Sequence, residues 1–167
     1  LPDEPATKTE TVSVTANKVM TLDSSGVEND KYDWVNLSDE ANIFQLNDSS
    51  SSTASIGKDA IKAAIEAKDS NVGDDFVITG FTVHYSYDVS ADVSMFCSAG
   101  GFDADGSWID LNNNSTPQFA DLTITSGNGT GTISSPASVT NYTQLTFNCG
   151  ATMSNSDTAS ITITGVD

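Results

Sequence analysis

The sequence predicts an all-β protein: a two-sheet antiparallel β-sandwich or jelly roll that carries one short helix. Its composition is the first reason, because 23 Ser, 20 Thr, 13 Asn and 12 Gly among 167 residues suit exposed strand faces and many turns. The second reason is a recurring alternation of apolar and polar residues in short segments that turn signals separate. Apolar residues make up 37% of the chain, which is enough for the core of one domain.

The chain begins with a segment that is typical of a linker. Residues 1–10 hold two Pro and three acidic residues, so we predict a linker or entry segment there and a single domain over 11–167. The segments that follow alternate as half-buried strands do. They are 11–16 and 19–22, then a turn at 23–26, the strands 32–35 and 41–46, and a serine-rich loop at 47–53.

One segment departs from the β pattern. Apolar residues recur at helical spacing at positions 56, 60, 61, 64 and 65, while Lys58, Lys62 and Glu66 fall on the opposite face. This spacing predicts a helix over 57–68 that covers one end or edge of the sheets.

The rest of the chain predicts strands. Their ranges are 76–79, 81–89, 93–98, 107–111, 119–125, 130–134, 142–151 and 159–163, with a turn at 126–129. In the strand at 142–151 the residues Leu145, Phe147 and Cys149 share one face, which we expect to point into the core.

The charge of the chain excludes several kinds of partner. Six Lys and no Arg stand against 23 acidic residues, for a net charge of −17, so the electrostatic field repels phosphate and anionic lipid. No apolar run reaches the length of a membrane span, and no signal peptide is recognisable. We therefore expect no nucleic acid and no membrane as partners, and the start at Leu1 reads as a mature or trimmed terminus beside further modules.

Two cysteines lie on separate predicted strands. A disulfide between Cys97 and Cys149 closes a loop of about 52 residues and stabilises the fold by roughly 4 kcal/mol in the chain-entropy model. We predict this disulfide; two buried free thiols are the alternative. A zinc site is disfavoured because two Cys and one His leave the usual four ligands incomplete.

No catalytic motif stands out. The single histidine, His84, lies on a predicted strand, and we interpret it as solvent-facing or locally hydrogen-bonded. A pair of carboxylates for glycoside hydrolysis stays open, with Asp33, Asp103, Asp105 and Asp110 nearest to the aromatic residues considered below. A small hydrolase is therefore one hypothesis, but we expect a protein that is not an enzyme.

Acidic residues gather in the segment 102–110. Asp103, Asp105 and Asp110 offer hard oxygen ligands around Gly106, as the opening of a calcium loop does, so a structural Ca²⁺ is one interpretation. An ordinary Asp-Gly hairpin turn explains the same residues, and we favour it. Apart from this Ca²⁺ we expect no cofactor.

The positions of the aromatic residues are the most informative feature. Six phenylalanines lie in apolar runs and read as core: Phe44, Phe76, Phe81, Phe96, Phe119 and Phe147. Trp34 and Trp108 instead lie among polar residues. A ring of this kind stacks on the apolar face of a sugar, while neighbouring amides and carboxylates bond its hydroxyls. The candidate glycan-binding residues are Tyr32, Trp34, Phe102, Trp108, Asn112 and Asn113. The alternative is that both tryptophans plug the ends of the sandwich.

The segments 32–34, 101–108, 145–149 and 160–166, within an acidic and Ser/Thr-rich chain, resemble the non-catalytic carbohydrate-binding modules of secreted bacterial systems that degrade plant polysaccharide. The resemblance covers roughly 11–167 and implies an extracellular module of a larger multimodular protein, free or attached to the cell surface. Its implied partner is a neutral polysaccharide or oligosaccharide. Two tryptophans on separate loops weakly favour a curved starch-type α-glucan over cellulose or another β-glucan.

A structural or adhesive cell-surface or scaffold domain that binds protein is the main alternative. It predicts that Trp34 and Trp108 are buried. An internal Lys–Asn cross-link, a feature of some such domains, would need a lysine in the core, and Lys18 is the candidate.

Overall fold

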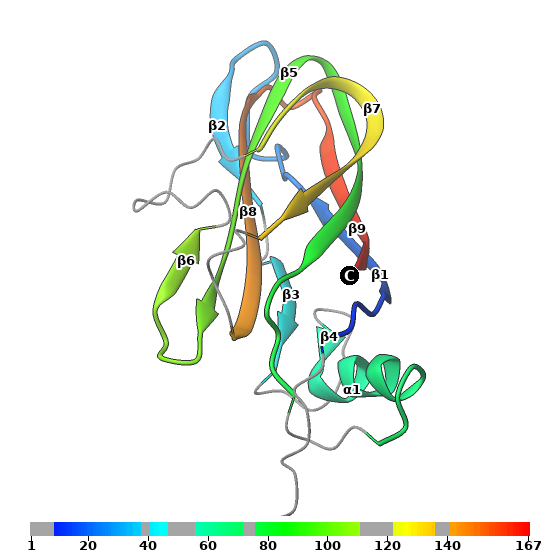
Figure 1. Ribbon diagram of the computed structural model, residues 1–167. Helices are drawn as coiled ribbons and strands as arrows, with labels where there is room; N and C mark the ends of the chain where they lie inside the picture. The colour runs from blue at the N-terminus through cyan, green and yellow to red at the C-terminus, as the bar shows by residue number, and fades with distance from the viewer. Residues whose placement is uncertain (1–8, 38–40, 47–55, 72–75, 111–121, 136–140) are drawn as a thin grey trace, which may run out of the picture.

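The computed structural model describes residues 9–37, 41–46, 56–71, 76–110, 122–135 and 141–167, and this part of the chain is mostly β with one helix (Figure 1). The strands are β1 (Val14–Thr21), β2 (Asp33–Asn36), β3 (Ala41–Gln45), β4 (Ile56–Gly57), β5 (Thr82–Asp103), β6 (Trp108–Asp110), β7 (Leu122–Ser134), β8 (Tyr142–Met153) and β9 (Ala159–Val166). The helix α1 spans Lys58–Glu66, close to its predicted range. Residues 1–8 of the predicted linker lie outside the described residues.

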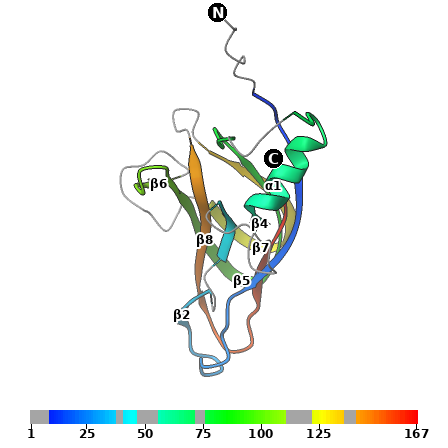
Figure 2. The ribbon, with the colours of Figure 1, turned by 90° about the horizontal axis from the view of Figure 1, so that it is seen from below.

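The strands form one nine-stranded sheet with the order β1-β9-β5-β8-β3-β4, while β2 pairs with β8, and β6 and β7 pair with β5. The long strand β5 connects what would otherwise be two layers. Its residues 83–89 pair with β9, and its residues 95–103 pair with β8. The predicted two-sheet sandwich is therefore not confirmed, because the sheet is continuous and curls until it nearly closes into a barrel (Figures 1 and 2).

The predicted break within β5 and the predicted turn within β7 are both wrong. Residues 81–89 and 93–98 belong to one strand of 22 residues, and 122–134 form a single strand that runs beside it. The two strands bend together where the register shifts between Val89 and Ser94. Asp92 and Gly127 have φ of 65° and 118°. Glycine adopts a positive φ without strain and Asp tolerates it. These two residues let the paired strands β5 and β7 bend without reversing direction.

One further predicted strand is not formed. Residues 76–79 make only an isolated bridge, Ile78 with Tyr142. Where they are described, the other predicted strands agree with the structure to within a few residues, and the two expected near the start, 11–16 and 19–22, are joined in β1. Residues 111 and 119–121 of the predicted strands lie outside the described residues.

The helix α1 lies at one end of the barrel, beside β1 and β4 (Figure 2). Ile61 is buried, and Ala60 and Ile65 pack partly against the core. On the opposite face Lys62 and Glu66 form an exposed i,i+4 pair with 3.8 Å between Nζ and Oε1. Burial of this apolar face holds the helix against the barrel end.

The core lies inside the curled sheet and is built by alternate residues of the strands. In β8 the predicted inward face is confirmed, since Leu145 and Phe147 are 0% exposed and Cys149 is 2% exposed. In β5, Met95 and Cys97 are likewise 0% exposed. The residues between them therefore lie on the outer face of the sheet, where Phe96 and Gly150 are register partners.

Candidate functional site

Two aromatic rings lie together on the outer face of the sheet. The ring centroids of Trp34 in β2 and Phe96 in β5 are 6.4 Å apart, and the ring planes differ by 24°. Trp34 is 43% exposed, and Phe96 is partly buried. We call these two residues the aromatic platform. The two rings together form an apolar patch at the sheet surface that a ligand can contact.

The platform depends on the strand that separates its two rings. In β8, Gly150 pairs with Asn36 on one side and with Phe96 on the other. The indole of Trp34 lies across this glycine, because a Cβ at position 150 would overlap Cζ2 and lie 2.8 Å from Cε2 of the ring. A glycine is thus required for the indole to lie flat against the sheet and reach Phe96.

A hydrogen bond fixes the direction of the indole. Its Nε1–H donates to Oδ1 of Asn36 at 2.9 Å, two residues along the same strand. At the start of β2 the backbone N–H of Trp34 donates to Oδ1 of Asp33 at 2.8 Å. With its N–H bonded to Asn36, the ring offers its apolar surface to solvent.

Uncharged polar side chains flank the platform on β5, β7 and β8. They occupy outward positions on the three strands that run beside it: Ser94 and Ser98 on β5, Thr123 and Thr125 on β7, and Asn148 and Thr152 on β8. All six are partly or fully exposed. Their hydroxyl and amide groups can donate and accept hydrogen bonds to a neutral, hydroxyl-rich ligand.

The structure places only some of the predicted binding residues near the platform. Tyr32 lies two residues before Trp34, just outside β2, and is 60% exposed. Phe102 is six positions beyond Phe96 on β5, which is about 20 Å along a strand. Between the two phenylalanines the outward pair Gly100 and Thr146 is buried, so Phe102 belongs to a separate part of this face.

The second predicted tryptophan is also remote from the first. The register places Trp108 of β6 opposite Phe102, whereas Trp34 lies on β2 beside β8. Only the backbone of Trp108 is described, and Asn112 and Asn113 lie outside the described residues. The two tryptophans therefore do not form one joint site around Trp34.

Sequence reasoning missed Phe96, Asn36 and Gly150. Phe96 was interpreted as core because it lies in an apolar run, but Met95 and Cys97 are the inward residues of that run. The alternation of side chains along β5 could have identified Phe96 as an outward residue. If Cys97 points inward, both of its neighbours in the strand lie on the outer face.

The acidic segment 102–110, for which a calcium loop was the alternative interpretation, forms a hairpin turn between β5 and β6. Oδ1 of Asp103 accepts the backbone N–H groups of Asp105 and Ser107, each at 2.9 Å. Gly106, with φ of 79°, donates its N–H to the carbonyl of Asp103. One carboxylate oxygen of Asp103 thus organises the turn, which supports the favoured hairpin interpretation. The side chain of Asp110 is not among those described.

His84 is locally hydrogen-bonded, as predicted. Its Nε2 is 2.8 Å from Oδ2 of Asp167, and Ser13 Oγ donates to Oδ1 of the same carboxylate at 2.8 Å. The bond from His84, and then the bond from Ser13, hold the pKa of Asp167 below its usual value. A catalytic triad needs histidine between serine and aspartate, whereas here Asp167 lies between the other two.

The predicted disulfide is confirmed. Cys97 and Cys149 are register partners on β5 and β8, joined inside the sheet with their Cα atoms 4.0 Å apart. A disulfide is consistent with an extracellular protein. Among the described residues, no helix is long and apolar enough to cross a membrane.

A polar groove of about 490 Å³ lies away from the platform, at the ends of β1 and β9. Asp23, Asp88 and Asp157 contribute to its lining, but two of these carboxylates are engaged locally, Asp23 with the N–H of Ser25 and Asp157 with the N–H of Ser154. In the described part of the chain, no three acidic, histidine or cysteine side chains come together in a way that could hold a metal ion.

No protein-family model, no curated protein and no solved structure matches this chain.

Proposed function

We propose that the chain is a non-catalytic glycan-binding module that holds a neutral polysaccharide on the aromatic platform. The observation that carries the proposal is a tryptophan ring that lies flat on a glycine beside a phenylalanine, while 43% of the residue stays exposed to solvent. A folded protein gains little from leaving indole in water, so an exposed ring fixed in place suits a ligand that covers it.

The charge around the platform supports a neutral ligand. The outward neighbours on β5, β7 and β8 carry hydroxyls and amides, and the molecule as a whole carries a net charge of −17. Anionic ligands are repelled by this field, whereas the hydroxyl groups of a neutral sugar bond to Ser, Thr and Asn without any charge.

The shape of the platform changes which glycan we favour. Two tryptophans on separate loops suggested a curved starch-type α-glucan, but the platform lies on neighbouring strands and its rings differ by only 24°. An apolar patch that runs across neighbouring strands of one sheet face fits an extended chain better than a helical one. We therefore propose an extended β-linked plant polysaccharide, such as cellulose, xylan or a mixed β-glucan, and keep starch as the comparison ligand.

The disulfide supports an oxidising compartment, and we propose that the module is secreted, within a multimodular protein that acts on plant cell walls. The competing adhesive interpretation expected Trp34 to be buried, and on this point it is wrong. Lys18, its candidate for a cross-link, is only partly buried.

Affinity electrophoresis on cellulose derivatives, xylan, mixed β-glucan and starch tests the proposal. We expect a β-glucan to retard the wild-type chain, Trp34→Ala to abolish the retardation, and the melting temperature to change little. Val19→Ser is the matched control, because it replaces another exposed apolar side chain, which lies on β1 and away from the platform. Equal migration of wild type and Trp34→Ala on every glycan would refute the site.

A further inference from the structure

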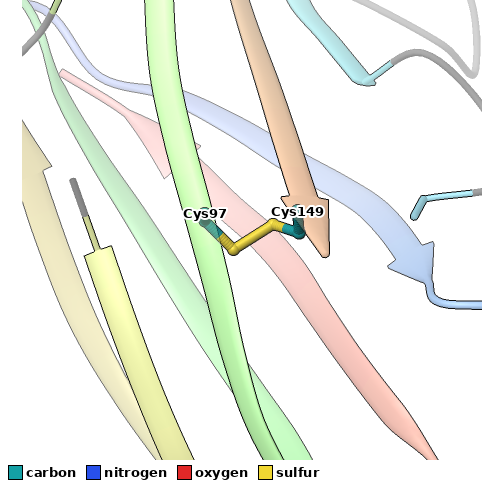
Figure 3. Close-up of a disulfide and its surroundings, with 2 residues drawn as sticks. All are labelled: Cys97 and Cys149. Carbon is teal, nitrogen blue, oxygen red and sulfur yellow. A yellow bond between two sulfur atoms is a disulfide. The ribbon is translucent and has the colours of Figure 1, made fainter. Parts of the chain in front are cut away.

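We infer that the Cys97–Cys149 disulfide is a positioning element for the aromatic platform, beyond its contribution to stability; this inference rests on the proposed function. The disulfide joins β5 to β8 on the inner side of the sheet (Figure 3). The next register pair along the same two strands is Phe96 with Gly150, which lies on the outer side and belongs to the platform. One covalent link therefore lies one residue away from the binding surface, on the opposite face.

Register at this point decides whether the platform exists. Because side chains alternate between the two faces of a strand, a slip of one residue between β5 and β8 would turn Phe96 toward the core and Cys97 outward. A slip of two residues would keep the faces but move Phe96 away from Gly150 and from the indole above it. Only the observed register places Trp34, Gly150 and Phe96 side by side.

The register of β5 before its bend does not carry over to this point. β5 changes partner from β9 at Val89 to β8 at Met95, and its pairing with β7 is irregular over the same residues. The ladder with β9 therefore does not propagate its register across the bend. On the outer face Gly150 offers no side chain to interlock with Phe96. Directly after the bend, β5 is held to β8 by the ladder that starts at Met95, and the disulfide is the covalent link within that ladder.

Two pairs of substitutions remove the link without removing the platform. Cys97→Ala/Cys149→Ala deletes both sulfur atoms, and Cys97→Val/Cys149→Ala restores part of the lost core volume. Ile161→Ala is the matched control, because this fully buried residue of β9 is paired with the other half of β5, and its truncation destabilises the fold without touching β8. All variants are measured in trimethylamine N-oxide, which favours the folded state of marginal chains.

The first readout is affinity for the glycan that binds wild type. We expect both cysteine variants to bind about tenfold more weakly, because a platform that must be ordered on binding loses affinity. Ile161→Ala should bind as wild type although it melts at a similarly lowered temperature. Cysteine variants that bind as tightly as Ile161→Ala would overturn the inference.

The second readout needs no ligand. In a Trp108→Phe background the tryptophan fluorescence comes from Trp34 alone. Its emission wavelength and its quenching by acrylamide report whether the ring still lies against Gly150 and Phe96. We expect loss of the disulfide to shift the emission to the red and to increase quenching, with no change for Ile161→Ala. If wild type binds no glycan, the proposed function is refuted, while the fluorescence still tests the positioning role. Unchanged fluorescence in the cysteine variants would overturn the positioning role in any case.

Discussion

The indole of Trp34 lies across Gly150, a residue that is 116 positions away in the sequence. Gly150 is in β8, where it pairs with Asn36 of β2. Because glycine leaves the outer face of β8 bare at this point, the ring lies flat and extends toward Phe96. The candidate site is therefore specified as much by an absent side chain as by the aromatic residues themselves.

Gly150→Ala tests this relationship directly. The added methyl group overlaps the indole, so we expect Trp34 to swing outward and glycan binding to fall by at least an order of magnitude. The exposed ring can move, so the free energy of unfolding should fall only by the ring contact with Phe96, about 1 kcal/mol. Titration calorimetry and urea unfolding separate the two effects. Gly26→Ala is the control, because nothing lies within 4 Å of its added Cβ; equal binding by both variants would contradict the prediction.

Asn36 should affect glycan binding by holding the indole ring of Trp34 in one direction. Asn36→Ala removes the acceptor of the indole N–H, and we expect several-fold weaker binding with a small change in melting temperature. Asn36→Asp keeps an oxygen at the same place and should retain most of the affinity. If Asp fails to rescue what Ala loses, Asn36 contacts the ligand itself rather than orienting Trp34.

Part of this site could be predicted from the sequence and part could not. The exposure of Trp34 was predictable from its polar neighbours, and the inward face of β8 from the alternation around Cys149. The pairing of β2 with β8 was not, because it joins residues that are more than a hundred positions apart. Without that pairing, neither Gly150 nor Phe96 can be recognised as a neighbour of Trp34.

The same reasoning explains why the mostly-β class is predicted while the two-sheet sandwich is not confirmed. Alternation predicts each half of β5 and of β7 correctly, because apolar and polar residues alternate within each half. In β5 the same parity faces inward on both sides of the bend, whereas in β7 it changes from Ile124 to Ile133. Alternation does not reveal that Gly127 continues a strand rather than closing a turn, because glycine with positive φ serves both. Two continuous bent strands are what turn the predicted sandwich into one curled sheet.

The disulfide should dominate the stability of the fold. Its loop spans 52 residues, so replacing both cysteines by alanine should lower the free energy of unfolding by about 4 kcal/mol in the chain-entropy model. Urea unfolding of the oxidised wild type and of the double variant measures the difference. A loss below about 1 kcal/mol would mean that the unfolded chain is already compact enough to make the link redundant.

Asp167 should make stability sensitive to acid. Hydrogen bonds from His84 and Ser13 lower its pKa in the folded state, so its contribution is complete above the ordinary aspartate pKa and is lost as the pH falls through the lowered value. We therefore expect Asp167→Asn to melt at a lower temperature than wild type at neutral pH, with the difference shrinking below about pH 4. Asp92→Asn, at an exposed position in the bend of β5, controls for the loss of one negative charge. A gap between wild type and Asp167→Asn that stays constant down to low pH would exclude this origin.

Salt dependence separates the glycan-binding proposal from adhesion to a protein. With a net charge of −17, any protein that this chain attracts through charge must present basic residues, and its affinity would fall steeply as salt screens that attraction. A neutral glycan on the aromatic platform loses nothing by screening, because ring stacking and hydroxyl hydrogen bonds carry the contact. We expect the dissociation constant for the bound glycan to change less than about twofold between low and high salt. A contact carried by several ion pairs would change it by more, because each screened pair alone weakens binding by up to about that factor or beyond. Calorimetric titrations of wild type and of Lys31→Ala, an exposed lysine near β2, measure this with and without one nearby cation. A steep salt dependence that Lys31→Ala removes would place an anionic group on the ligand and rule out the neutral polysaccharide.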